Sequence, residues 1–197
     1  MKLLGMSAMV AALAVQVQAA VNVYMTVADA NGNNIGTTNS QTTLIKNAIE
    51  IQGYSFGTEQ TINLSSQSSG AGAGKIHFDA FTLSKTVDAN TPVFFNRMAQ
   101  GLPNTITIYF FKVTGGATTR GQQAYMTWQF RTAAFSAQSF SGDEGDDGPR
   151  ESLSFQYGAL QISYTPTKTD GTPGTPTASG WNSVKNTAEV QMVSKGN

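Results

Sequence analysis

Cysteine is absent from the chain. Disulfide bonds and thiolate zinc sites are therefore excluded, and stability outside the cell must come from packing or from assembly. The single histidine, His77, cannot form a metal site by itself. Charge is also scarce, since only 12% of the residues are Asp, Glu, Lys or Arg and the formal net charge is zero. The chain thus lacks the basic surface that nucleic acid or an anionic membrane would require, and we expect neither as a partner.

Long apolar runs are missing except at the N-terminus. Lys2 is followed by an apolar run over residues 6–15. Small side chains come next, so the whole segment is typical of a secretory signal peptide that is cleaved after Ala19 or Ala20. The run is too short for a membrane-spanning helix. The alternative is a first strand or helix of the domain itself, but strand-like alternation begins only at Val21.

The rest of the chain has the size of one domain. We expect a signal peptide at residues 1–19 and a single domain with an extended C-terminal tail at 20–197, because no linker separates two cores. The tail from Pro166 to Gly180 is rich in Thr, Pro and Gly and predicts an extended linker. The mature protein is expected outside the cell or in the periplasm, with no membrane association after the signal is removed.

Alternation at period two predicts most of the secondary structure. The expected strands are residues 21–27, 49–57, 75–85, 104–113, 124–137 and 151–164. One helix is expected over 93–100, because the side chains at 88–91 suit an N-cap, Pro92 suits the first turn and Gly101 ends the apolar pattern. Many strands with short turns and one helix predict a mainly β fold, either a barrel or a sandwich.

A glycine-rich run precedes the strand that begins at Lys75. It resembles a phosphate-binding loop, but serine stands where that motif needs its first glycine, and Ile76 stands where it needs Ser or Thr. Gly70, Gly72 and Gly74 are spaced G-x-G-x-G and lead into a strand rather than a helix, which also excludes the dinucleotide motif. The small residues instead predict a compliant loop that another backbone can approach closely, and therefore contact between chains.

Two groups of reactive side chains have simpler explanations than a functional site. Four carboxylates at residues 143–147 could bind calcium, but their spacing matches no EF-hand, and a solvated acidic loop is favoured. His77 and Asp79 lie on one strand face and could form an acid/base pair, but no G-x-S-x-G motif or second histidine supports a triad. We therefore predict a protein that is not an enzyme, with no catalytic residues, no metal and no cofactor.

Four stretches of the chain resemble, in order, the hemolysin-coregulated protein (Hcp) family, the tube protein of type VI secretion. They are residues 51–57, residues 70–86 with the sequences GAGK and FTLSK, residues 142–168 ending in YTPTK, and the terminal GWN at 180–182 with Asn186. The resemblance implies a small β-barrel of two antiparallel sheets with one flanking α-helix. It also implies hexameric rings that stack into a tube, are expelled by a contractile sheath, and carry small effectors in the lumen.

The resemblance further implies where copies of the chain meet. The loop from Thr61 to Lys75 would contact the neighbouring ring. Independently of the resemblance, Trp181 is an aromatic residue in polar sequence, which predicts that it docks in a groove of its own domain or of a neighbour. The expected interface residues are Ser68, Gly70, Gly72, Gly74, Lys75, Trp181 and Asn182. The expected partners are a homo-hexamer, further rings stacked on it, secreted effectors, and sheath or spike proteins.

The chain departs from the family in two places. Family members usually begin at the first strand without a signal peptide, because the tube is built in the cytoplasm. The segment from Ala28 to Thr43, uncharged apart from Asp29, replaces a short charged segment. An exported filament, or a secreted β-domain binding module acting without a sheath, is therefore the alternative function, and a hydrolase using His77 is a third. For an ordinary tube protein, the location before ejection would be the cytoplasm.

Overall fold

Residues 21–39, 42, 44–62, 73–112, 123–146 and 148–190 are described by the computed structural model. The expected signal peptide and the loop residues Ser68, Gly70 and Gly72 lie outside these ranges. In the part of the chain that the structure describes, no helix has the length and apolar character needed to cross a bilayer.

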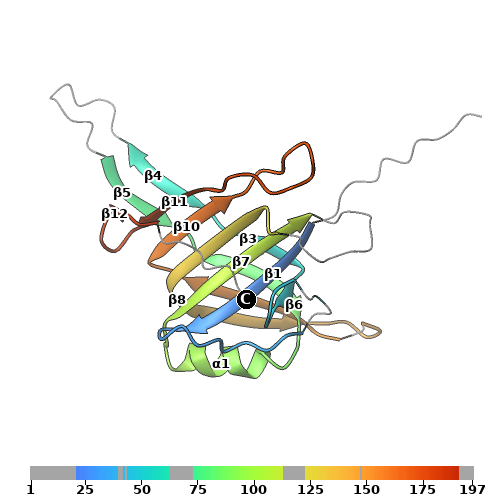
Figure 1. Cartoon of the computed structure of the whole chain (residues 1–197). Coiled ribbons are helices and arrows are strands. Elements are labelled where there is room, and N and C mark those ends of the chain that lie inside the picture. The colour runs from blue at the N-terminus through green and yellow to red at the C-terminus, as the bar shows by residue number, and fades with distance from the viewer. Residues whose placement is uncertain are drawn as a thin grey trace, which may run out of the picture.

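Strands dominate the described chain, with a single short helix (Figure 1). The elements are β1 (Val21–Asp29), β2 (Ile49–Ile51), β3 (Gly53–Ser55), β4 (Thr58–Ile62), β5 (Ala73–Phe78), β6 (Phe81–Thr86), α1 (Thr91–Ala99), β7 (Asn104–Lys112), β8 (Met126–Ser141), β9 (Arg150–Gln156), β10 (Ala159–Tyr164), β11 (Thr177–Asn182) and β12 (Thr187–Ala188). The strand pairs between these elements are antiparallel, so the mainly β prediction is confirmed.

The long strand β8 belongs to two sheets. Its first half pairs with β7 and β10, within a sheet ordered β12-β11-β10-β8-β7-β1-β2. Its second half, from Ala134 onward, pairs with β9 in a sheet ordered β8-β9-β6-β3. Thr132 lies between the halves with a φ of 49°, and this left-handed backbone turns the strand from one sheet into the other.

The two sheets also meet at β2 and β3, which are consecutive in sequence. β2 pairs with β1, whereas β3 pairs with β6. Between them the backbone N–H of Gln52 donates to the carbonyl of Ser84 at 2.8 Å. The predicted arrangement of two antiparallel sheets with one flanking helix is therefore confirmed, but the strand ladders among the described residues do not form a fully closed barrel.

The core lies between the two sheets and is rich in aromatic side chains. Met25, Ile108 and Phe130 point inward from the first sheet, while Phe81 and Phe155 point inward from the second. This alternation is the pattern from which the strands were predicted. α1 covers one end of the sheets (Figure 1), and Phe94 packs against Phe135 with ring centroids 4.9 Å apart.

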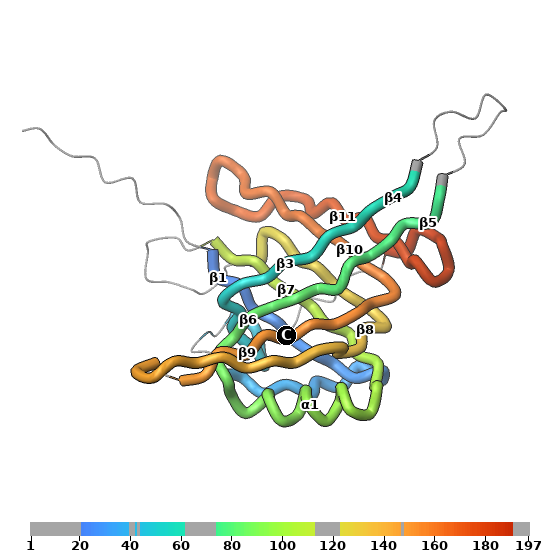
Figure 2. The backbone as a smooth tube through the Cα atoms, turned by 180° about the vertical axis from the view of Figure 1, so that it is seen from behind, coloured from blue at the N-terminus to red at the C-terminus, as the bar shows by residue number. Residues whose placement is uncertain are grey.

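The expected strand over 75–85 is wrong in extent. The chain breaks at Asp79, whose N–H donates to the carbonyl of Gly57 at 3.0 Å, and the two halves take different partners. β5 pairs with β4 as a hairpin that projects beyond the sheets (Figure 2), whereas β6 pairs with β3 and β9. Apolar alternation continues across the break, so the sequence pattern carries no signal of the change of partner.

The start of α1 also differs from the prediction. Pro92 occupies the first turn as expected, but the side chain of Asn90 does not cap the helix. Instead its Oδ1 accepts from the N–H of Thr37 at 2.7 Å, and its Nδ2 donates to the Thr37 carbonyl at 3.0 Å. Asn90 therefore fastens the loop after β1 to the helix.

The C-terminal region is more ordered than the expected linker. An isolated bridge joins Thr167 to Pro173, and β11 then pairs with β10 over its whole length. The sequence pattern did not predict this strand, because Thr177–Asn182 contains glycine, alanine and serine rather than a run of β-branched residues.

Candidate assembly surface

The β4–β5 hairpin contains the described part of the expected interface loop. Thr58, Glu59 and Gln60 pair with Phe78, His77 and Ile76. A Cβ atom on Gly74 would lie 2.8 Å from the backbone oxygen of Thr61, so only glycine allows the two strands to approach this closely. Lys75 is exposed on the same strand. The structure therefore places Gly74 and Lys75 on a projecting hairpin.

Aromatic contacts anchor the base of the hairpin to the sheets. Phe78 stacks on Tyr157 with centroids 5.1 Å apart, and Phe56, just before β4, contacts Trp128 at 4.8 Å. Burial raises the pKa of the Tyr157 hydroxyl well above its ordinary value, and the charge of Asp79 adds to the effect. Burial therefore favours the neutral form of the Tyr157 hydroxyl.

The other two expected interface residues lie together on β11 but on opposite faces. Trp181 pairs with Leu160 on the core side and keeps 36% of its surface exposed. Asn182 is only 8% exposed, because its Nδ2 donates to Glu189 at 2.6 Å and its Oδ1 accepts from the Lys185 N–H at 2.9 Å. Trp181 is thus available for contact, while Asn182 holds the C-terminal turn in place.

His77 and Asp79 form a solvent-exposed pair. His77 Nε2 lies 3.5 Å from Asp79 Oδ1, and both side chains are largely in solvent. An exposed pair of this kind contributes little to stability. His77 lies on β5 of the projecting hairpin, and Asp79 follows directly after this strand.

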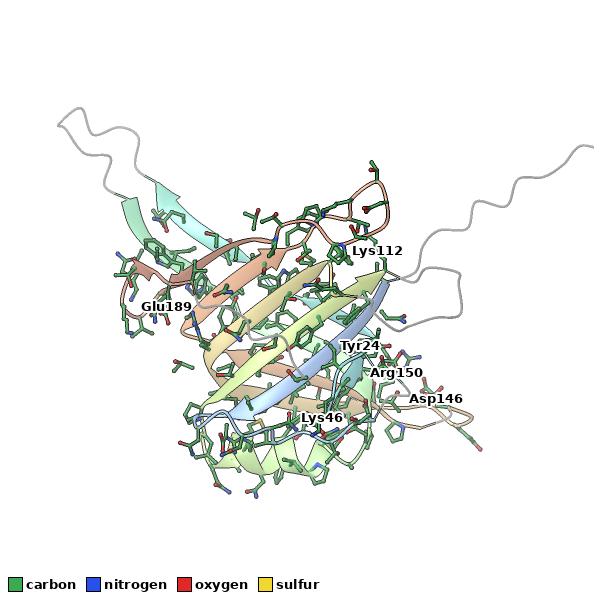
Figure 3. All side chains as sticks on the ribbon, viewed as in Figure 1. Tyr24, Lys46, Lys112, Asp146, Arg150 and Glu189 are labelled. Atoms are coloured by element: carbon green, nitrogen blue, oxygen red, sulfur yellow. The ribbon has the colours of Figure 1, made fainter. Side chains whose placement is uncertain are left out.

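The acidic loop folds on itself without gathering its carboxylates. Asp146 accepts from the backbone N–H of Asp143 at 3.0 Å, and its own N–H donates to the Asp143 carbonyl at 3.1 Å. Asp147 lies outside the described residues. Within the described ranges no three His, Cys, Asp or Glu side chains come close enough to hold a metal ion. Figure 3 shows Asp146 on the hairpin between β8 and β9, away from the sheets.

The sequence patterns did not predict a buried network of charged residues. Lys85 and Glu151 are both fully buried, and Lys85 Nζ lies 2.8 Å from Glu151 Oε2 and 2.8 Å from Asp88 Oδ1. The Thr91 hydroxyl donates to Glu151 Oε2 at 2.5 Å, and Gln138 Nε2 donates to Glu151 Oε1 at 2.7 Å. The network therefore joins β6, β8 and β9 to the start of α1. Charges of opposite sign at inward positions of two expected strands were the available signal.

We expect the substitution Asp88→Asn to make the free energy of unfolding less dependent on pH in the acidic range. Burial opposes ionisation of Asp88, but the hydrogen bond and charge of Lys85 outweigh it and hold the pKa below its ordinary 3.8. The ionised carboxylate thus stabilises the fold above pH 3.8, and this contribution is lost as the pH falls through the lower pKa of the folded state. At pH 7 we expect a loss of about 1.5–3 kcal/mol, the usual effect of losing a hydrogen bond to a charged group.

Urea unfolding at several pH values measures this effect. The gap between the wild-type chain and Asp88→Asn should narrow from pH 6 to pH 2, whereas Asp143→Asn in the exposed loop should show no such gap. A gap that stays constant over this range would show that Asp88 is not stabilised as an anion.

Comparison with known proteins decides the family. The family model of the type VI secretion system effector Hcp matches residues 24–164. The chain belongs to the Hcp family. It is therefore a tube or effector protein of type VI secretion, a class of secreted proteins, as the sequence resemblance implied. No curated protein matches the sequence.

Solved structures share the Hcp fold. A type VI secretion system protein is 22% identical, with a TM-score of 0.71 over 86% of this chain and 100% of its own. Hcp1 from Salmonella typhimurium is 16% identical, with a TM-score of 0.63 over 87% and 100%. Hcp3 from Pseudomonas aeruginosa, a secreted protein, is 16% identical, with a TM-score of 0.55 over 83% and 98%. At these identities the likeness concerns the fold.

Proposed function

We propose that this Hcp-family chain is a structural subunit that forms hexameric rings, which stack into a secreted tube and carry effectors in the lumen. The observation that carries the proposal is the family match over residues 24–164. The fold is consistent with a structural role, because its charged network is buried and its His77–Asp79 pair is exposed to solvent. Sheath and spike proteins would be its partners within the apparatus.

The β4–β5 hairpin is the proposed contact between rings. Gly74 and Lys75 lie on it, and the other loop residues, Ser68, Gly70 and Gly72, belong to the segment that joins its two strands. A two-stranded hairpin is only marginally stable alone, and a neighbouring ring would supply the missing contacts. Trp181 would add an aromatic contact, while Asn182 would act by holding the turn behind it.

Electron microscopy of the mature protein tests the proposal directly. Six domains of this size around a lumen should give rings about 80 Å across, or longer tubes. A protein that stays monomeric at high concentration contradicts the proposal.

We expect the substitution Gly74→Ala to weaken stacking without unfolding the sheets. Its Cβ atom would press on the backbone of Thr61 at 2.8 Å and separate the strands of the hairpin. Gly142→Ala is the matched control, since its Cβ atom would lie at an ordinary 3.5 Å from Pro149. Microscopy should show single rings for Gly74→Ala and stacked rings for the control. Equal stacking in both variants would show that the hairpin is not part of the interface between rings.

The N-terminal run favours a second function, that of an exported filament or secreted binding module without a sheath. Mass spectrometry of the mature N-terminus separates the two functions. A start at Ala20 or Val21 in the medium or periplasm supports export through a cleaved signal. A start at Met1 in a cytoplasmic fraction supports the ordinary tube protein.

A further inference from the structure

After β12 the chain turns onto the outward face of the larger sheet. The N–H of Glu189 donates to the carbonyl of Gly180 at 3.0 Å. Its carboxylate lies 3.3 Å from Nη2 of Arg131, on β8, and accepts from Nδ2 of Asn182 at 2.6 Å. Figure 3 shows Glu189 beside the β10–β11 side of this sheet. Contacts with two strands, β8 and β11, thus fix the position of the chain at this residue.

Glycine at position 180 permits this crossing. A Cβ atom there would lie 2.2 Å from the backbone oxygen of Glu189 and 3.2 Å from Cβ of Gln161. The backbone of Glu189 therefore lies directly against β11, on the same face as the Gln161 side chain. Any other residue at this position would lift the chain off the sheet.

A row of uncharged residues continues from this crossing across the sheet. The strand registers place Gly180 opposite Gln161, Gln161 opposite Gln129, Gln129 opposite Thr107, and Thr107 opposite Thr26. We call these five residues the outer row. On β1, β7 and β8 these residues alternate with core residues, and Gln161 on β10 follows the core residue Leu160, so their side chains lie on the outward face.

Two members of the outer row are buried, although the outward face of an antiparallel sheet is usually solvated. Gln161, next to the crossing, is 1% exposed, and Thr107, two strands further on, is 5% exposed. The chain at Glu189 accounts for the cover over Gln161. Thr107 lies two strands beyond Gln161 in the same row.

We propose that the outer row is a docking track for the chain's own C-terminal segment, Gln191 to Asn197. Five strands span four spacings of about 4.8 Å, or roughly 19 Å from Gly180 to Thr26. The eight residues from Val190 to the end cover about 26 Å when extended, at about 3.3 Å each. The segment is therefore long enough to reach β1, and Glu189 starts it in the right place.

The absence of cysteine makes a crosslinking test direct. At about 3.3 Å per residue, Met192 would reach Gln129, so Gln129→Cys with Met192→Cys in the full chain should form a disulfide within one molecule. Thr82→Cys with Met192→Cys is the control, because Thr82 lies on the outward face of the other sheet and pairs with Ser154. Under mild oxidation we expect the first pair to form at least about ten times faster, since a disulfide needs Cα atoms within roughly 7 Å.

Two results would overturn the proposal. One is equal disulfide formation in the two pairs. The other is a disulfide that joins two molecules, which would place the segment on a second copy of the chain.

Truncation supplies an independent measurement. Thr107→Cys should react with a thiol reagent at least about ten times faster in a chain that ends at Val190 than in the full chain, because its cover is gone. Thr82→Cys should react equally in both. Circular dichroism would establish that the truncated chain is folded. Equal reactivity of Thr107→Cys in the two folded chains would also overturn the proposal.

Discussion

The substitution Lys85→Met should lower the free energy of unfolding by about 3–5 kcal/mol, the usual cost of removing one partner from a buried ion pair. Lys85 is the cation that faces both Glu151 and Asp88, each at 2.8 Å. Without it, the fully buried carboxylate of Glu151 and the partly buried carboxylate of Asp88 face each other, and Glu151 has no other charged partner among the described residues. Urea unfolding measures the loss.

Two controls make this expectation specific to the pair. Lys75→Met, on the exposed face of the hairpin, should change stability by less than about 0.5 kcal/mol. Adding Glu151→Leu to Lys85→Met should restore part of the loss, because the unpaired buried charge is then gone. A loss below about 1 kcal/mol for Lys85→Met would mean that water or a rearranged partner replaces the lysine.

Phe81→Ala should destabilise the protein by about 3–5 kcal/mol, as is usual when a large aromatic side chain is removed from a core. The Phe81 side chain is fully buried on β6. Its ring contacts the rings of Tyr54, Phe56, Trp128, Phe130 and Phe155. The cavity would therefore open where the two sheets pack on each other, and neither sheet could collapse into it without losing contacts to the other.

Phe95→Ala is the matched control, since Phe95 on α1 is 58% exposed. It should cost less than about 0.5 kcal/mol. Thermal unfolding of both variants beside the wild-type chain makes the comparison. Similar losses for Phe81→Ala and Phe95→Ala would show that the aromatic cluster does not hold the sheets together.

Alternation predicted the strands that have one solvated or polar face. β1 and β7 fall within two residues of their expected bounds, because Met25 and Ile108 face the core while their sequence neighbours do not. The single helix was found for a similar reason, since Pro92 and Gly101 mark its limits. These signals are local, and a single sequence displays them directly.

Features that depend on contacts between distant segments of the chain could not be predicted in the same way. The break at Asp79 exists because β5 pairs with β4 while β6 pairs with β9, and both halves alternate in sequence. β11 is a strand because β10 offers it an edge, despite its weak propensity. The side chains at 88–91 were expected to cap α1, but the side chain of Asn90, the residue at the cap position, binds a loop more than fifty residues earlier in the chain.

The same holds for the candidate site: its local features were predicted from the sequence, and its contacts between distant residues were not. The glycine at position 74 was recognised as a place for close backbone approach, and the approach is to Thr61 of its own hairpin. Asn182 was expected at an interface, but its side chain is occupied by Glu189, which no local pattern links to it. Whether the hairpin and Trp181 contact a second ring depends on another molecule, and the stacking experiment tests it.

The pairing of β1 with β7 has a consequence for the time at which the protein folds. β1 starts at Val21, but its long ladder is with β7, which begins only at Asn104. Ladders between strands so far apart in sequence form slowly, because a large loop must close before any pairing energy is gained. β2 pairs with β1 only at Val23–Met25, so most of the first strand stays unpaired until β7 has been synthesised. A signal peptide directly before Val21 would be presented on a chain that is still unfolded.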